Sequence, residues 1–218
     1  MTNLSAIIYA HNNERTIRSI VIRAVDYYFD EVIVINSGST DKTELAIKRL
    51  CNHYDFKYFL ISENEGIGHA LATGVERSFG ETILFIDASY TKISDHHFEK
   101  MIIPVRNKEV DMIIGQPKAS LIDYSRNPNK SFAVMRCFQK YNILPIIDRI
   151  KKQKGGTELF INLYYQMEGK KVKCIMLEGI KQQSYFNDQR LSKLETELFN
   201  SEQKYLQKAY SNLYLNIK

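Results

Sequence analysis

Short apolar runs alternate with segments of helical periodicity over the first half of the chain. The apolar runs predict strands at 4–10, 32–35, 57–61, 82–86 and 111–115. Between them, apolar residues recur three and four positions apart. This predicts helices at 14–29 and about 41–50, a helix that follows NEGIGHALATG and runs to about Phe79, and a helix at about 95–103. Ser94 can cap the last of these helices, and Gly80 is expected to end the third. Strands joined in turn by helices favour an α/β fold with a mainly parallel sheet flanked by helices.

The second half of the chain has a less regular pattern. Residues 115–130 are rich in turn-forming residues and predict a loop near a ligand site. Residues 131–150 predict a helix interrupted by Pro145, and 151–156 predict a flexible basic loop. A helix is expected at 157–168 and a strand at 171–177. No internal repeat or low-complexity linker divides the sequence, so a single domain over 1–218 is expected.

The C-terminal segment predicts an amphipathic helix over about 190–217. Its apolar stripe consists of Leu191, Leu194, Leu198, Tyr205, Leu206, Ala209 and Leu213. This stripe either completes the core or mediates self-association with a second copy; alternatively, it lies on a membrane surface. Five basic residues against three acidic ones give only a weak attraction to anionic lipid, so at most peripheral membrane contact is expected.

The composition is that of a globular protein with a mildly basic balance. Hydrophobic residues make up 44% of the chain and charged residues 25%, and the net charge is +5. That charge suits anionic small molecules, but it is too diffuse to indicate nucleic acid binding. The three cysteines have no C-x-x-C spacing and read as reduced thiols. No signal peptide is visible and no apolar run approaches the ~20 residues of a membrane span, so a cytoplasmic protein is expected.

Polar clusters follow three of the predicted strands. They are His11–Glu14, Asn36–Asp41 and Asp87–Tyr90. Ligands of parallel α/β sheets bind at the carboxyl ends of the strands, so these three clusters are expected to surround one binding site.

Four segments resemble the nucleotide-binding half of family 2 glycosyltransferases, in the same order and at about the same spacing. They read SAIIYAHNNERTI, EVIVINSGSTDKT, NEGIGHALATGVE and ETILFIDASYTKIS. The segment GGTELFINLYYQMEGKKVKCIMLEGI resembles the later part of that domain, notably in the polyprenyl-phosphate sugar transferase branch. The resemblance implies a GT-A fold, with a Rossmann-like nucleotide-binding half at about 1–115 and an acceptor half at about 116–185. It also implies transfer of a sugar, usually with inversion, from a nucleotide-sugar donor to an acceptor such as a lipid phosphate or a cell-envelope glycan.

The resemblance also assigns roles to individual residues. Asp87 matches the first acid of the family's Asp-x-Asp motif, which orients the donor and holds Mg²⁺ or Mn²⁺. Glu158 matches an acidic position that serves as the base. His11, Asn13 and Asn36 would line the base pocket of a UDP- or GDP-sugar. The other positions expected to bind the donor are Tyr9, Ala10, Ser37, Gly38, Gly66, Gly68, Ala88 and Ser89.

Simpler explanations exist for several of these residues. An Asp after a strand can cap a turn, and an acid in the first turn of a helix is favoured by the helix dipole alone. The lysines at 151, 152 and 154 could hold a diphosphate or simply face solvent. His96 and His97 are adjacent on a predicted helix, so their side chains diverge by about 100° and do not face one metal ion.

The sequence departs from the family pattern in one direction. At Asn13, Asn36, Ser37 and Ser89, neutral residues stand where carboxylates are expected or common. Amides and hydroxyls can hydrogen-bond a nucleotide, but they hold divalent cations less well than carboxylates do. The predicted metal site is therefore weak, or absent without donor. The alternative to an enzyme is a catalytically degenerate relative that binds a ligand or partner without turnover.

Overall fold

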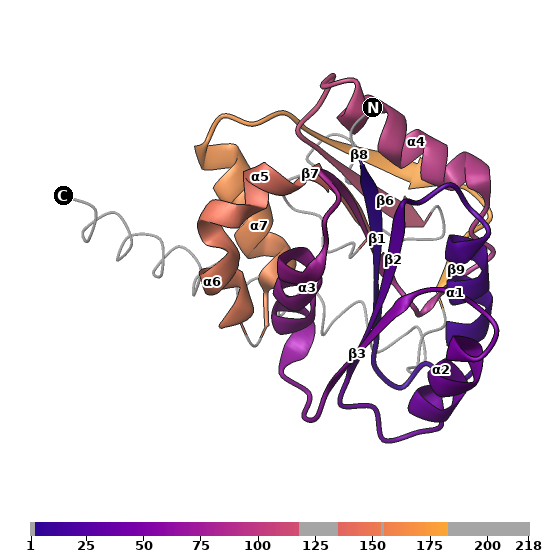
Figure 1. Ribbon diagram of the computed structural model, residues 1–218. Coiled ribbons are helices and arrows are strands. Elements are labelled where there is room, and N and C mark those ends of the chain that lie inside the picture. The colour runs from indigo at the N-terminus through magenta and orange to yellow at the C-terminus, as the bar shows by residue number, and fades with distance from the viewer. Residues whose placement is uncertain (1–2, 118–134, 154, 183–218) are drawn as a thin grey trace, which may run out of the picture. The chain divides into compact units, whose positions relative to one another are not determined.

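A seven-stranded sheet forms the centre of the described chain (Figure 1). The computed structural model describes residues 3–117, 135–153 and 155–182, which belong to one compact unit. Across the sheet the strands are β3 (Lys57–Ile61), β2 (Glu31–Ser37), β1 (Leu4–Ala10), β4 (Thr82–Asp87), β7 (Arg136–Gln139), β6 (Met112–Pro117) and β8 (Val172–Leu177). β7 is antiparallel to both neighbours, and the other neighbouring pairs are parallel. A separate antiparallel pair joins β5 (Tyr90–Thr91) to β9 (Lys181–Gln182). The predicted, mainly parallel α/β fold is confirmed.

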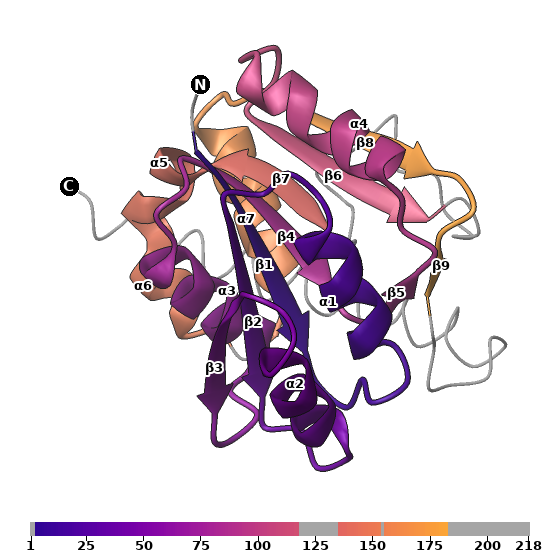
Figure 2. The same ribbon diagram turned by 45° about the vertical axis from the view of Figure 1, so that its right-hand side comes forward.

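Helices cover both faces of the sheet, as the two views in Figures 1 and 2 show. One face carries α1 (Ile17–Val25), α2 (Thr43–Cys51) and α4 (Asp95–Arg106). The other face carries α3 (Gly66–Arg77), α6 (Ile147–Lys151) and α7 (Thr157–Met167). A short helix α5 (Lys140–Ile143) and a 3₁₀ helix η2 (Leu144–Ile146) lead from β7 into α6. Because helices lie on both sides, the strands between them are apolar along their lengths rather than alternating.

The central strands β1, β2 and β4 are buried almost throughout. Ile7 of β1 pairs in register with Ile33 of β2 and with Phe85 of β4, and all three side chains are buried. The continuous apolar runs at 4–10, 32–35 and 82–86 therefore predicted these strands correctly.

Helix boundaries differ slightly from the predicted ones. α4 begins after Ser94 as expected, in a capping box in which Ser94 and His97 each receive the other's backbone N–H. α3 ends at Arg77, before Gly80, so Gly80 does not end that helix. Gly80 instead lies against β1, where a Cβ atom would be 2.4 Å from the hydroxyl oxygen of Ser5. That close approach explains the glycine better than a helix end does.

The prediction of a helix over 131–150 was wrong for residues 136–139. These residues form β7, which bonds to β4 on one side and to β6 on the other. The gap between two buried strands offers hydrogen-bond partners on both edges, and this tertiary context overrides the local helical pattern. From Lys140 onward the segment is helical as expected, and Pro145 lies in the first turn of η2, where its missing N–H costs little.

Several predictions fall wholly or partly on residues that the structure does not describe, among them the candidate Lys154 and residues 131–134 of the predicted helix at 131–150. The predicted C-terminal helix at about 190–217 lies wholly outside the described residues, and the predicted loop at 115–130 lies outside them from residue 118 onward.

Phe138 provides a test of β7 as a central strand. Its side chain is fully buried, whereas Tyr141, three residues later, is 60% exposed. We expect Phe138→Ala to lower the free energy of unfolding by about 3–5 kcal/mol and Tyr141→Ala to lower it by less than about 1 kcal/mol, as measured by urea denaturation. Similar losses for the two variants would contradict the position of β7 in the core.

Candidate active site

The loops that follow β1 and β2 are joined by reciprocal hydrogen bonds. Oδ1 of Asn12 accepts from the backbone N–H of Thr40 at 2.8 Å, and the backbone N–H of Asn13 donates to Oγ1 of Thr43 at 2.7 Å. Asn12 has a φ of 55°, in the left-handed region that asparagine tolerates better than most residues. The first two predicted clusters therefore form one structure at the carboxyl edge of the sheet.

His11 connects these loops to a third one. Its Nδ1 donates to the carbonyl oxygen of Ser37 at 2.6 Å, and its Nε2 lies 3.3 Å from the side-chain nitrogen of Asn64, which follows β3. A carbonyl can only accept, so Nδ1 carries the proton and Nε2 is left to accept from the amide. Both polar atoms of the ring are thus used to hold three loops together.

Asn36 is buried at the end of β2 and stabilises the turn that follows it. Its Oδ1 accepts from the hydroxyl of Ser39 at 2.6 Å and from the backbone N–H of Ser39 at 3.3 Å. Gly38 has a φ of 58°, and a Cβ atom there would lie 2.5 Å from the backbone nitrogen of Asn64. The turn is therefore closed against the segment after β3, and a side chain at residue 38 would push the two apart.

Asp87 lies at the end of β4 with its carboxyl group buried. The backbone N–H of Ser89 donates to Oδ1 of Asp87 at 2.7 Å, and the N–H of Ala88 donates to the carbonyl oxygen of Tyr9 at 2.8 Å. Burial raises the pKa of Asp87 above its ordinary value, and the hydrogen bonds from Ser89 oppose this shift. The third predicted cluster is thus a tight turn that adjoins β1.

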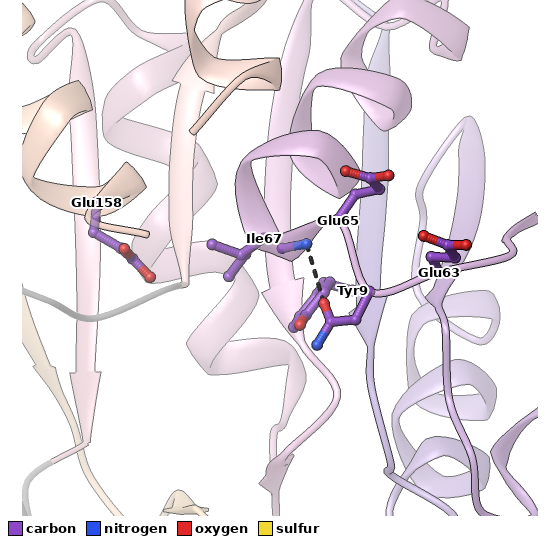
Figure 3. Close-up of a pocket in the computed structure, with 7 residues that line it drawn as sticks. Tyr9, Glu63, Glu65, Ile67 and Glu158 are labelled. Atoms are coloured by element: carbon purple, nitrogen blue, oxygen red, sulfur yellow. Dashed lines mark hydrogen bonds between the residues drawn. The ribbon is translucent and has the colours of Figure 1, made fainter. Parts of the chain in front are cut away.

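A cavity of about 570 Å³ opens beside these loops (Figure 3). Its lining residues are Tyr9, Glu63, Asn64, Glu65, Gly66, Ile67 and Glu158. Glu158 projects from the start of α7 toward Ile67, while Glu63 and Glu65 project from the segment after β3. The cavity therefore lies between the end of β1, the segment after β3 and the first turn of α7.

Tyr9 links the two candidate catalytic acids. Burial raises the pKa of Tyr9 to about 12, and the negative charges of Asp87 and Glu158 both add to the rise. The same two acids also raise the pKa of the buried Tyr90. Asp87 and Glu158 lie far apart in the sequence, and the fold brings both of them to the same tyrosines.

The two glycines predicted to bind the donor have different surroundings. Gly66 has a φ of 85°, lines the cavity, and donates its backbone N–H to Oδ1 of Asn64 at 3.0 Å. Gly68 lies in α3 against α6, where a Cβ atom would be 2.4 Å from the carbonyl oxygen of Ile150 and 2.8 Å from Oγ1 of Thr157. Gly68 therefore permits the helices around the cavity to pack closely.

Four cavity residues were missed as candidates. They are Glu63, Asn64, Glu65 and Ile67. They follow the carboxyl end of β3, so the rule that identified the other three clusters applies to them as well. Arg136, a buried cation on β7, was missed because its segment was expected to be a helix.

One of the three candidate lysines and one of the two adjacent histidines have structural explanations. Lys151 donates to Oε2 of Glu76 on α3 at 2.7 Å. His97 is buried, accepts the backbone N–H of Ser94 at Nδ1, and donates from Nε2 to the carbonyl oxygen of Glu178 at 2.9 Å. Within the described residues, no group of three or more histidine, cysteine or acidic side chains is arranged to hold a metal ion. No helix among them is both long enough and apolar enough to cross a membrane.

Known proteins share this sequence pattern. The family model described as glycosyl transferase family 2 matches residues 5–169. The poly-beta-1,6-N-acetyl-D-glucosamine synthase of Staphylococcus epidermidis is 22% identical over 163 residues, covering 74% of this chain and 38% of that protein. The same enzyme of Staphylococcus aureus (strain COL) is 27% identical over 166 residues, covering 75% and 39%. The chain thus spans about two fifths of the length of these curated relatives.

Solved structures share the fold. Glucosyl-3-phosphoglycerate synthase from Mycobacterium tuberculosis, in complex with Mn²⁺, UDP and glucosyl-3-phosphoglycerate, matches with a TM-score of 0.68 at 16% identity, over 89% of this chain and 75% of that one. S. aureus TarS 1–349 matches with a TM-score of 0.64 at 14% identity, over 79% and 58%. The resemblance to the polyprenyl-phosphate branch stays a prediction. Because the family model covers well over half of the sequence and the fold agrees, the chain belongs to glycosyl transferase family 2 and has the GT-A fold.

Proposed function

We propose that this chain transfers a sugar from a UDP- or GDP-sugar to a hydroxyl group of an acceptor. The observation that most supports this is the convergence of Asp87 and Glu158 on Tyr9 beside the cavity. The volume of about 570 Å³ lies within the range of roughly 300–1,000 Å³ that small-molecule sites occupy. Structural neighbours solved with UDP support the nucleotide part of the donor.

The proposed reaction is a direct displacement at the anomeric carbon. Glu158 takes the proton of the acceptor hydroxyl while the acceptor oxygen forms a bond to that carbon. The bond between the carbon and the diphosphate breaks, and the nucleoside diphosphate leaves; the family resemblance implies inversion. Asp87 orients the donor from the end of β4, and the loops held by His11 and Asn36 form the wall of the base pocket.

We propose a glycan hydroxyl, rather than a lipid phosphate, as the acceptor. Glu63, Glu65 and Glu158 line the cavity, and their negative field already opposes the diphosphate of the donor. An acceptor phosphate would add a second anion to the same site, whereas a glycan hydroxyl adds no charge. The curated relatives named as synthases of a sugar polymer support the same choice. Self-association, peripheral membrane contact and a cytoplasmic location remain predictions from the sequence.

A divalent cation fits these residues only poorly. Asp87 offers one carboxylate, and its Oδ1 already accepts the N–H of Ser89. The described residues contain no cluster that could complete the coordination shell. We propose that Mg²⁺ or Mn²⁺ binds weakly or not at all without donor, and we assign no step to a metal. The neutral residues at the motif positions 13, 36, 37 and 89 also favour the alternative function, in which the protein binds a ligand or partner without turnover.

A ligand screen tests donor binding and metal binding together. In thermal unfolding, a UDP- or GDP-sugar at ~100 times its dissociation constant should add about 2.7 kcal/mol of stability, because it binds only the folded state. Mn²⁺ alone should give no shift. A clear shift with micromolar Mn²⁺ alone would contradict the weak metal site, and no shift with any nucleotide or nucleotide-sugar would contradict the donor site.

Glu158→Gln tests the base. The amide keeps the size of the side chain but cannot take a proton, so transfer or donor hydrolysis should fall by about 10²-fold or more while donor affinity changes little. Glu44→Gln, in a surface ion pair on α2, is the matched control and should retain activity. Full activity in Glu158→Gln would exclude this base, whereas donor binding without turnover in the wild type would establish the binding-only alternative.

Asp87→Asn tests whether the buried acid is retained for function rather than stability. Because the pKa of Asp87 is raised in the folded protein, its stabilising contribution is present below the ordinary value of 3.8 and is lost as the pH rises through the folded pKa. The free energy of unfolding of Asp87→Asn, relative to the wild type, should therefore increase as the pH rises above the ordinary value of 3.8 and through the folded pKa. The exposed Asp55→Asn is the control. A difference that stays constant with pH in urea titrations would refute the prediction.

A further inference from the structure

Arg136 is a charged residue in the middle of the sheet. It lies on β7, pairs in register with Phe85 of β4 and Ile114 of β6, and is only 1% exposed. A guanidinium group buried in this way is costly unless hydrogen bonds and an opposite charge compensate for it. The proposed reaction, as described so far, gives this residue no role.

The alternation of β7 directs Arg136 toward α7. Gln139, on the opposite face of the strand, donates to the carbonyl oxygen of Val105 on α4 at 3.0 Å. Nη1 of Arg136 instead donates to Oδ1 of Asn162 on α7 at 2.6 Å, and Asn162 is fully buried. The guanidinium therefore lies beneath the inner face of α7.

Glu158 is one helical turn before Asn162 on that same face. Residues four apart in a helix have Cβ atoms about 5–6 Å apart, so a guanidinium bonded to Asn162 is within reach of the Glu158 carboxylate. Burial lowers the pKa of Arg136 to about 10, and the charge of Glu158 opposes that shift more than any other charge does. Arg136 consequently remains a cation at neutral pH and acts on Glu158 from inside the protein.

We propose that Arg136, anchored by Asn162, is a positioning residue that keeps the carboxylate of Glu158 ionised and directed into the cavity. The catalytic role of Arg136 rests on the proposed function, because that function takes Glu158 as the base. The electrostatic interaction between Arg136 and Glu158 does not depend on the proposed function. Arginine suits this task because its planar fork can bond Asn162 and a carboxylate at the same time.

The other groups around Glu158 make such a cation necessary. The cavity walls and neighbouring strands present tyrosine hydroxyls and further carboxylates; these are Tyr9, Tyr90, Glu63, Glu65 and Asp87. On α6, Lys151 is paired with Glu76. Negative neighbours favour a protonated Glu158, which cannot serve as a base. The positive charge of the buried Arg136 opposes the effect of these negative neighbours on Glu158, and its side chain does not occupy the cavity.

The titration of Glu158, followed by NMR of ¹³C-labelled glutamate and assigned with Glu158→Gln, tests the link. In Arg136→Met the midpoint should move upward by about one pH unit or more, because the opposite charge is gone. In Arg136→Lys the charge remains and the midpoint should stay within a few tenths of the wild-type value. Gln139→Met, a buried polar change on the same strand but the opposite face, is the matched control and should leave the midpoint unchanged.

A double variant covers the case in which Arg136→Met does not fold. Replacing a buried polar pair with apolar residues of similar volume is often neutral for stability, so Arg136→Met combined with Asn162→Leu should fold and show the same upward shift. An unchanged midpoint in the charge-free variants, or an equal shift in Gln139→Met, overturns the proposal. This readout needs no turnover, so an inactive wild type would refute the proposed function and leave the electrostatic link to be judged by the titration alone.

An active wild type permits a second readout. The acid limb of the pH profile of kcat should move upward in the charge-free variants in step with the NMR midpoint, while the KM for donor stays unchanged. Loss of activity at every pH without movement of the acid limb would indicate a structural role only and would contradict the positioning role.

Discussion

The hydrogen bonds that β1 makes on both of its edges set the geometry of the site. On one side they align Ala10 with Asn36, and on the other they align Tyr9 with Asp87. The strands β1, β2 and β4 are buried on both faces, so a shift of one residue in their pairing would disrupt packing above and below the sheet. Asn36 and Asp87, at the ends of β2 and β4, and His11, directly after β1, therefore lie at the same edge of the sheet, where the loops that follow them hydrogen-bond to one another.

These loops also show what the neutral motif positions retain. Oδ1 of Asn36 accepts from Ser39, and Oδ1 of Asn13 accepts the backbone N–H of His11 at 2.8 Å. An amide oxygen can fill these acceptor positions as well as a carboxylate can, so the loops keep their shape. What the substitutions remove is negative charge. Asp87, at the end of β4, keeps its carboxyl group, and burial of that group raises its pKa because the charged form is costly inside the fold.

The antiparallel strand β7 lies between two strands that precede it in the sequence, β4 and β6. Its position between β4 and β6 places Arg136 under α7 and Gln139 under α4, so one short strand contacts helices on both faces. Of the two strands beside β7, β4 is the one that ends at Asp87. The electrostatic effect of the buried Arg136 reaches Tyr90 as well as Glu158.

The sequence by itself determined the parallel half of the sheet, the helices around it and the family. Continuous apolar runs and helical periods are local signals, and the rule for strand ends then located the His11, Asn36 and Asp87 clusters. The same rule covered the glutamates after β3, but their role became visible only when α7 closed the cavity opposite them. Local pattern could not identify β7, because a strand of four residues is defined by the partners on its two edges. Nor could it identify Arg136, because the meaning of a buried charge depends on which opposite charge the fold brings beside it.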